Sequence, residues 1–292
     1  MSFIFPAAER QKISDCVMKT FAVGSGGLLS LKTNVGSIHV NVGETSDVSV
    51  EVLVHIEDGT PDEAALQNKN AQLNCTQNGN NVDFLAEFHR LNGRLGIEFR
   101  ILVPRTYNVK LKSGAGNISI DGMEGETYAE TSGGELSFKR IVGHVSGRTA
   151  GGNINAAEIR GTVSVSTAGG SIAIEHVTAG VVAQTSGGSI RIEDLGGEIE
   201  ATTKGGSVAA RMSNQIVDDC YLTTLAGNVI VELNQASAFD IDAETRAGSI
   251  VTEFPITMRG KLRGNSCKSS INGGGPKLIL RSSAGDIHLR KL

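Results

Sequence analysis

The sequence predicts an all-β protein, a parallel β-solenoid whose coils are 18 residues long. The first observation is a turn whose glycine recurs every 18 residues, at positions 116, 134, 152, 170, 188 and 206. The second is that apolar and polar residues alternate after each of these glycines, which is typical of a strand with one buried face. The third is composition, because 37 glycines, no tryptophan and 4% aromatic residues suit narrow coils. A short fixed repeat of this kind indicates coils that stack only on their neighbours.

Two columns of residues define the repeat when the recurring glycine is position zero. Position 2 is an aliphatic column, expected to be buried: Ile118, Leu136, Ile154, Ile172, Ile190 and Val208. Position 15 is a threonine column, whose hydroxyl groups we expect to stack on one another: Thr131, Thr149, Thr167, Thr185 and Thr203. The repeated glycines are expected at corners, where a positive φ is easily reached.

Before the regular coils, the N-terminal part is rich in predicted strands. Residues 1–20 form a separate N-terminal segment, either a helix or a loose arm. From Phe21 on, strands are predicted at 29–31, 33–40, 48–54, 82–88 and 96–103, and the run 33–40 matches the repeat with Gly36 at position zero. One short helix is predicted to begin at Thr60, with Pro61 in its first turn and Glu63 completing a capping box, and to end before Asn74.

We expect residues 21–292 to form a single solenoid domain, with regular coils at 109–210 and irregular coils at 211–292. The next repeat glycines, Gly227 and Gly248, each follow their predecessor by 21 residues. The first excess of three residues falls in segment 211–220, which should bulge from one corner. The period then fails until a last coil at 281–289, which follows a turn at 271–276.

Composition limits the classes of partner and compartment. The net charge of −4 gives no basic footprint for nucleic acid, and no apolar stretch reaches the length of a membrane span. The four cysteines lie too far apart for a zinc or redox motif, so four unpaired thiols are expected. No secretory leader is visible, so we expect a cytoplasmic protein as written, or a cell-envelope protein if a leader was removed.

The strand–turn unit T-x-[GA]-G-[SND]-[IV]-x-[IV] resembles the bacterial DUF4097 or "toast-rack" proteins, which are often labelled adhesins. The approach to the first coil at 101–104 and the turn at 272–276 also look like that family. The resemblance covers about Leu31 to Leu289. It implies a β-helical fold and a location at the cell envelope, and it supplies no established catalytic residues.

The sequence contains few residues in patterns that carry chemistry. The corners lack the aspartate column of calcium-binding β-rolls, so we expect no metal and no cofactor. The candidate carboxylate pairs for glycoside hydrolysis are Asp240 with Asp242, which share one strand face, and Asp218 with Asp219 in the expected bulge. Other weak candidates are His39 and His288 for acid–base or metal chemistry, with Asp286 beside His288, and Cys75 or Cys220 as a nucleophile. Each is more often a structural or surface residue.

We therefore expect a non-enzymatic scaffold or adhesin-like module that binds a protein partner. The alternatives are an enzyme with its site in segments 211–220 or 254–276, and a filament subunit that self-associates through open solenoid ends. Insertions that leave the stacked strands are free to carry function. The predicted partner surface comprises Arg211, Asp218, Asp219, Arg259, Lys261, Arg263 and Lys268.

Overall fold

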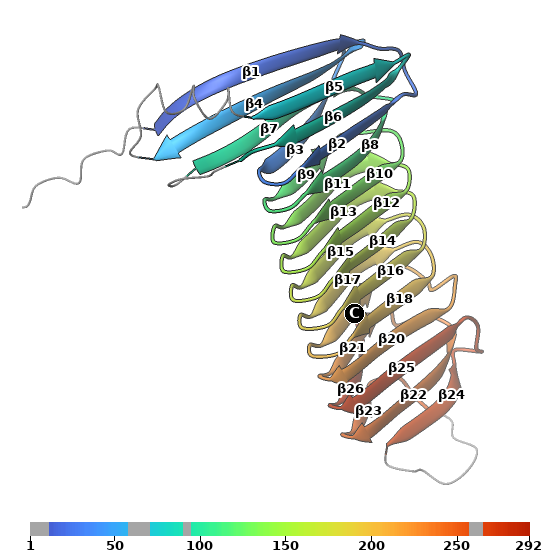
Figure 1. Ribbon diagram of the computed structural model, residues 1–292. Helices are drawn as coiled ribbons and strands as arrows, with labels where there is room; N and C mark the ends of the chain where they lie inside the picture. The colour runs from blue at the N-terminus through green and yellow to red at the C-terminus, as the bar shows by residue number, and fades with distance from the viewer. Residues whose placement is uncertain (1–11, 58–70, 90–94, 257–264) are drawn as a thin grey trace, which may run out of the picture.

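The computed structural model describes residues 12–57, 71–89, 95–256 and 265–292, and all regular structure within them is β-strand. Two mostly parallel sheets of 13 strands lie face to face and form a rod (Figure 1). Sheet A contains, in spatial order, β1 (Lys12–Ala22), β4 (Asp47–Glu57), β7 (Leu95–Pro104), β3 (Ser37–Gly43), β9 (Ile118–Asp121), β11 (Leu136–Val142), β13 (Ile154–Arg160), β15 (Ile172–Val177), β17 (Ile190–Leu195), β19 (Val208–Met212), β21 (Val229–Leu233), β26 (Ile287–Lys291) and β23 (Ile250–Thr252). Sheet B contains β24 (Ser266–Ile271), β22 (Phe239–Ala247), β25 (Lys277–Ala284), β20 (Cys220–Ala226), β18 (Ile199–Thr203), β16 (Val181–Thr185), β14 (Val163–Thr167), β12 (Val145–Thr149), β10 (Thr127–Thr131), β8 (Asn108–Ser113), β2 (Leu28–Thr33), β6 (Asn81–Glu87) and β5 (Gln72–Asn78).

In the middle of the rod, each coil places one strand in each sheet. Leu136 pairs with Ile118 on one side and with Ile154 on the other, so equivalent residues stand 18 positions apart. The whole aliphatic column at position 2 is buried, and the side chains at positions 3 and 5 point outward. The 18-residue parallel solenoid predicted from the repeat is confirmed.

Four successive strands of sheet A, β11, β13, β15 and β17, each contain a residue in the left-handed region. These residues stand at position 6 of successive coils, with φ of 51°, 59°, 54° and 50°: Arg140, Glu158, His176 and Asp194. The left-handed residue shifts the strand by one position, as a bulge does, so positions 4 and 7 both face the core. This explains why Phe138 and Ile141, three residues apart, are both buried.

The five glycines at position zero from Gly134 to Gly206 are needed for close approach rather than for a positive φ. A Cβ on Gly134 would lie 1.9 Å from the carbonyl oxygen of Gly116 in the coil before it. The backbone of Gly134 is not among those with positive φ, whereas Gly125 and Gly143, at the other corner, have φ of 155° and 140°. The positive-φ explanation is therefore wrong for the glycines at position zero from Gly134 to Gly206.

The threonine column is buried, but its hydroxyl groups do not stack on one another as predicted. The hydroxyl of Thr167 donates to the carbonyl oxygen of Gly152 at 2.9 Å and accepts from the backbone N–H of Gly170 at 3.2 Å. Thr131, Thr149, Thr185 and Thr203 repeat the bond to a glycine carbonyl. A buried hydroxyl needs a partner with good geometry, and the corner backbone offers one in every coil.

At both ends of the rod, the order of the coils departs from the order of the sequence. Strands β2 and β3 lie directly beside β8 and β9, while β6 and β7 lie farther out. At the other end, the last strands β25 and β26 insert between β20–β21 and β22–β23. The predicted last coil therefore exists, but it is not the terminal layer of the solenoid.

A single apolar core runs through the described part of the chain. Its middle is aliphatic, and Phe138 fits there because Gly147 leaves room, since a Cβ on Gly147 would lie 2.8 Å from the phenyl ring. Aromatic rings fill the wider ends. Phe84 and Phe99 pack edge to face at 6.4 Å near the N-terminal end, and Phe239 and Phe254 do so at 5.6 Å at the other.

The structure bears on two predictions for the N-terminal part, the N-terminal segment 1–20 and the helix from Thr60. Residues 12–20 belong to β1, which pairs antiparallel with β4, so neither a helix nor a loose arm holds for them. The helix predicted from Thr60 falls on residues 58–70, outside the described residues, and from Gln72 on the chain is already strand β5. That residues 21–292 form a single domain stays a prediction.

Candidate functional site

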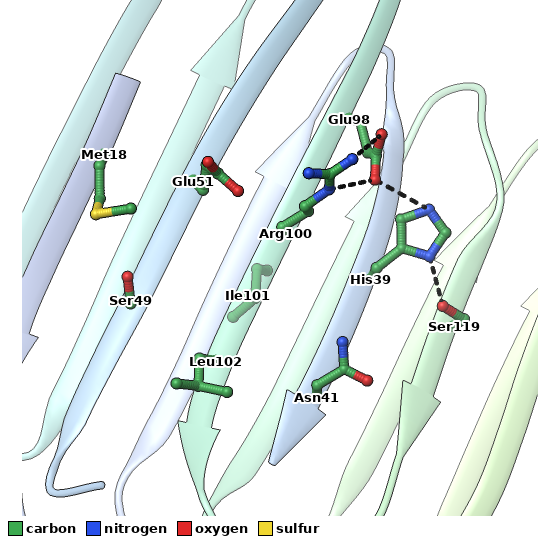
Figure 2. Close-up of a pocket in the computed structure, with 10 residues that line it drawn as sticks. All are labelled: Met18, His39, Asn41, Ser49, Glu51, Glu98, Arg100, Ile101, Leu102 and Ser119. Carbon is green, nitrogen blue, oxygen red and sulfur yellow. Dashed lines mark hydrogen bonds and ion pairs between the residues drawn. The ribbon is translucent and has the colours of Figure 1, made fainter. Parts of the chain in front are cut away.

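The outer face of sheet A at the N-terminal end carries a cluster of polar side chains around Glu98. Five adjacent strands, β1, β4, β7, β3 and β9, supply it, and alternation turns every second residue of each strand outward. Figure 2 shows Glu98 and Arg100 on β7 beside His39 on β3. We call this region the Glu98 hollow; it has a volume of about 450 Å³, and its lining residues are Met18, His39, Asn41, Ser49, Glu51, Glu98, Arg100, Ile101, Leu102 and Ser119.

Glu98 is held by a cation and two histidines. Its carboxylate accepts hydrogen bonds from Arg100, at 2.8 Å from Nε and 3.4 Å from Nη2. His55 Nε2 lies 3.6 Å from the other carboxylate oxygen, and His39 Nε2 lies 4.0 Å from the first. The hydrogen bond from Arg100 holds the pKa of the Glu98 carboxyl below its ordinary value, although partial burial acts in the opposite direction.

The periphery of the hollow mixes further polar contacts with exposed apolar side chains. His39 Nδ1 lies 2.7 Å from the hydroxyl of Ser119 on β9, and the thiol of Cys16 lies 3.4 Å from a carboxylate oxygen of Glu51. Met18 and Leu102 are 61% and 40% exposed on the same face. A shallow surface with exposed apolar residues beside charged ones suits contact with another macromolecule.

His39 and Ser119 have the spacing of a general base and a nucleophile, but no acid in the described part of the chain is hydrogen-bonded to His39 to orient it. An orienting acid should bond the histidine at about 2.6–3.2 Å. Glu98 is 4.0 Å from His39 and is already engaged by Arg100 at 2.8 Å. Nor do three or more His, Cys, Asp or Glu side chains in the described residues form a metal-binding group.

We predict that the Glu98→Gln variant loses a pH-dependent part of its stability. A carboxyl whose pKa is lowered by folding stabilises the protein above its ordinary pKa of 4.5, and that contribution disappears as the pH falls through the lower folded value. The difference in unfolding free energy between wild type and Glu98→Gln, about 1 kcal/mol or less at this partly exposed site, should therefore be present at pH 7 and vanish toward pH 3. Urea titrations across this range measure it.

Arg100→Gln supplies the control for this prediction. Because Arg100 is the main cause of the lowered pKa, Glu98→Gln should have much less effect in an Arg100→Gln background. A pH-independent difference, or the same difference in both backgrounds, would contradict the prediction.

Four of the sequence-predicted partner residues lie in the described part of the chain, and the structure places them in three separate regions. Arg211 lies on the outer face of sheet A, in a hollow of about 240 Å³ that Arg191 and Arg290 also line. Asp218 and Asp219 lie in the loop before β20, on a different hollow of about 720 Å³ with Pro276. Lys268 is on β24 at the end of sheet B. Arg259, Lys261 and Arg263 lie outside the described residues.

Two of these residues have structural roles. Asp219 accepts the backbone N–H of Lys277 at 2.8 Å and so joins the inserted strand β25 to the loop. Lys268 Nζ lies 2.8 Å from a carboxylate oxygen of Asp242, which Arg281 also contacts at 2.9 Å. The extra residues predicted at 211–220 lie in segment 213–219, between β19 and β20.

The cysteine candidates from the sequence are buried or partly buried thiols, and Asp286 and Asp240 already accept hydrogen bonds. Burial raises the pKa of the Cys220 thiol to about 12 and raises that of Cys75, which opposes a nucleophilic thiolate. All four cysteines are unpaired, as predicted. Asp286 accepts from the backbone N–H and the hydroxyl of Ser249 at 2.8 and 2.9 Å, and Asp240 accepts from Ser270 at 2.6 Å.

Sequence reasoning missed the Glu98 hollow because five strands from distant parts of the chain build it. Alternation at 96–103 already places Glu98 and Arg100 on one outward face. The missing information was the order of strands, which sets β7 between β4 and β3.

One family model matches nearly the whole chain. The family model described as "Toastrack DUF4097" matches residues 29–290. No curated protein shows significant similarity to the chain. Over the described residues, no helix has the length and apolar character to cross a bilayer.

Three crystal structures are similar over nearly the whole chain. A "putative cell adhesion protein" from Clostridium sporogenes ATCC 15579 is 10% identical, with 96% of this chain and 100% of that chain covered and a TM-score of 0.32. A "putative adhesin" from Bacteroides fragilis NCTC 9343 is 12% identical, with 95% and 97% covered and a TM-score of 0.35. One from Parabacteroides distasonis ATCC 8503 is 10% identical, with the same coverage and a TM-score of 0.39. Similarity at this level does not bear on function.

Proposed function

The chain belongs to the Toastrack DUF4097 family, and from this premise we propose that it is a non-enzymatic scaffold or adhesin-like module that binds a protein partner. The Glu98 hollow is the proposed contact. The observation that supports it most is the exposure of Met18 and Leu102 beside the charged group of Glu98, Arg100 and Glu51. Apolar contacts supply affinity when they are desolvated, and the charges around them set the orientation of the partner.

The rigid backbone beneath the hollow favours this use. Strand β7 is hydrogen-bonded to β4 on one side and to β3 on the other, so the side chains stand on the interior of a sheet. A sheet face of this kind presents its residues in fixed positions and loses little conformational entropy when a partner binds. The partner is expected to offer an apolar residue that packs between Met18 and Leu102.

Leu102→Glu tests this proposal, with Val182→Glu as the matched control. Both residues are outward-facing and similarly exposed, at 40% and 37%, but Val182 lies on the opposite sheet. Immobilised wild type and both variants should be exposed to a lysate of the source organism. The proposal requires a protein retained by wild type and by Val182→Glu but depleted at least about ten-fold by Leu102→Glu, the size expected when a central apolar contact is lost. Equal retention by all three, with unchanged circular dichroism, would overturn it.

The predicted partner residues enter the proposal as a second contact. Arg211 is exposed beside Arg191 and Arg290, whose neighbours Glu193 and Glu232 reduce the local positive charge. Arg211→Glu in the same capture experiment, repeated at low and high salt, tests whether this hollow assists association. Charge reversal at Asp218, Asp219 and Lys268, measured as the amount of captured partner at low and high salt, tests whether these residues belong to the proposed surface.

The alternatives have weaker support. An enzyme at 211–220 or 254–276 needs convergent groups, and the described parts of these segments place Arg211, Asp218 and Lys268 in separate places. The cytoplasm and the cell envelope are both compatible with partner binding, and cell fractionation distinguishes them. Self-association is favoured by the 11-residue strand β1, which lies at the edge of sheet A.

A further inference from the structure

Among the described residues, β1 is the longest edge strand of the two sheets. It is 11 residues long, whereas the other edge strands β5, β24 and β23 have 7, 6 and 3 residues. Within the part of the chain that the structure describes, β4 is its one hydrogen-bonded neighbour, and the backbone groups on the other side of β1 point away from the sheet. Figure 1 shows β1 at the outer end of the rod. An open edge of this length can take up a further strand.

β1 carries charged residues, Lys12, Asp15 and Lys19, but it lacks two other features that protect an edge strand, a bulge and a proline. All 11 residues pair with β4 in one uninterrupted register, from Lys12 with Glu57 to Ala22 with Asp47, so no bulge twists the edge away. The strand contains no proline. On its two faces, Val17 and Phe21 are only partly buried against the core, and Met18 is 61% exposed. An added strand would cover this apolar surface.

The residues of β1 are complementary to a second, antiparallel copy of themselves. The midpoint of Lys12–Ala22 is Val17, and a two-fold axis there would align all 11 residues. Val17 would face Val17 of the second copy, Asp15 would face Lys19, and Cys16 would face Met18. Opposite charges and apolar pairs directly across an antiparallel ladder are favourable, and like charges there are not.

We propose that two copies of the chain associate by antiparallel pairing of β1 with β1 about a two-fold axis at Val17, so that sheet A continues from one copy into the other. The interface is isologous and therefore closes as a dimer instead of growing into a filament. It also brings the two Glu98 hollows onto one continuous sheet face, because Met18 on β1 lines the hollow. The dimer does not depend on the proposed partner, since its contacts are backbone bonds and β1 side chains.

Disulfide trapping tests the register. In a Cys16→Ser, Cys75→Ser background, Val17→Cys should form a disulfide-linked dimer on mild oxidation, because directly opposed residues lie about 4.5–5.5 Å apart at Cα. Thr20→Cys is the control, since the two copies of residue 20 would stand six positions apart, about 20 Å along the strand. Cross-linking of Thr20→Cys as fast as Val17→Cys would overturn the register, and a wild-type chain that sediments as a monomer at about 50 μM would overturn the dimer.

A charge exchange tests the contact independently of any disulfide. Lys19→Asp places two Asp–Asp contacts across the axis and should weaken the dimer roughly ten-fold. Adding Asp15→Lys to Lys19→Asp restores opposite charges and should return the dissociation constant to within about two-fold of wild type. Failure of the double variant to recover, with both variants folded, would contradict the proposal. The Leu102→Glu capture experiment tests a residue on β7, which lies outside the β1–β1 contact. The proposed dimer and the proposed partner contact can therefore be contradicted independently.

Discussion

Replacing Gly134 by alanine is expected to destabilise the protein by more than about 3 kcal/mol, whereas alanine at the adjacent Gly133 should be neutral or slightly stabilising. The Cβ of the new residue at 134 would lie 1.9 Å from the oxygen and 2.2 Å from the carbon of the Gly116 carbonyl. Both are backbone atoms of a stacked coil, so relief requires the two coils to separate. At Gly133, a Cβ meets no atom within 4 Å.

The pair is measured by urea unfolding of wild type, Gly133→Ala and Gly134→Ala, since the midpoint and slope together give the free energy of unfolding. Gly133→Ala controls for the loss of backbone freedom that any glycine-to-alanine change causes in the unfolded chain. If the two variants unfolded at the same urea concentration, coil packing at position zero would not be the reason for glycine there.

The regular coils could be predicted from sequence because they are specified by local, repeated information. Period-2 alternation fixes which residues face the core, and the 18-residue spacing fixes the register, as the pairing of Ile154 with Leu136 and Ile172 shows. The reason for the glycines could not be obtained in this way. Glycine occurs both where a turn needs a positive φ and where a neighbouring coil leaves no room for a Cβ atom. The sequence alone does not distinguish these two reasons.

The bulge in β11, β13, β15 and β17 has a signal in the sequence. Positions 4 and 7 are both apolar, a spacing of three that alternation does not allow without an extra residue between them. At position 6, Arg140, Glu158, His176 and Asp194 hold the left-handed conformation, although only His and Asp among them are types that favour it. Stacking against the next coil therefore overrides local preference.

The ends of the rod and the Glu98 hollow depend on contacts between distant parts of the sequence. The repeat places residues 37–43 among the coils, but nothing near them shows that β7 lies on the other side of β3. Likewise, nothing near residues 277–284 shows that β25 inserts before β22. The hollow combines residues as far apart as Met18 and Ser119. Its outward side chains were predictable strand by strand, but its composition required the strand order.

Ile172→Asp is expected to remove more than about 4 kcal/mol of stability, the largest effect of any substitution considered, because it buries a carboxylate without a partner. Ile172 is 1% exposed and stands between Ile154 and Ile190 in the aliphatic column. A charge there is surrounded by apolar side chains on both neighbouring coils. The variant should unfold at the lowest temperature in the series, or fail to fold.

Ser171→Asp is the matched control, one residue away and outward. The hydroxyl oxygen of Ser171 accepts the backbone N–H of Ser189 at 3.2 Å, and an aspartate oxygen can accept the same bond, as Asn153 Oδ1 does from Ser171 at 2.9 Å. Its unfolding free energy should stay within about 0.5 kcal/mol of wild type. If Ile172→Asp is insoluble, Ile172→Ala provides a measurable value, expected at about 2–5 kcal/mol from the lost contacts and the cavity. Equal melting temperatures for Ser171→Asp and either Ile172 variant would show that the inward and outward faces of β15 are wrongly assigned.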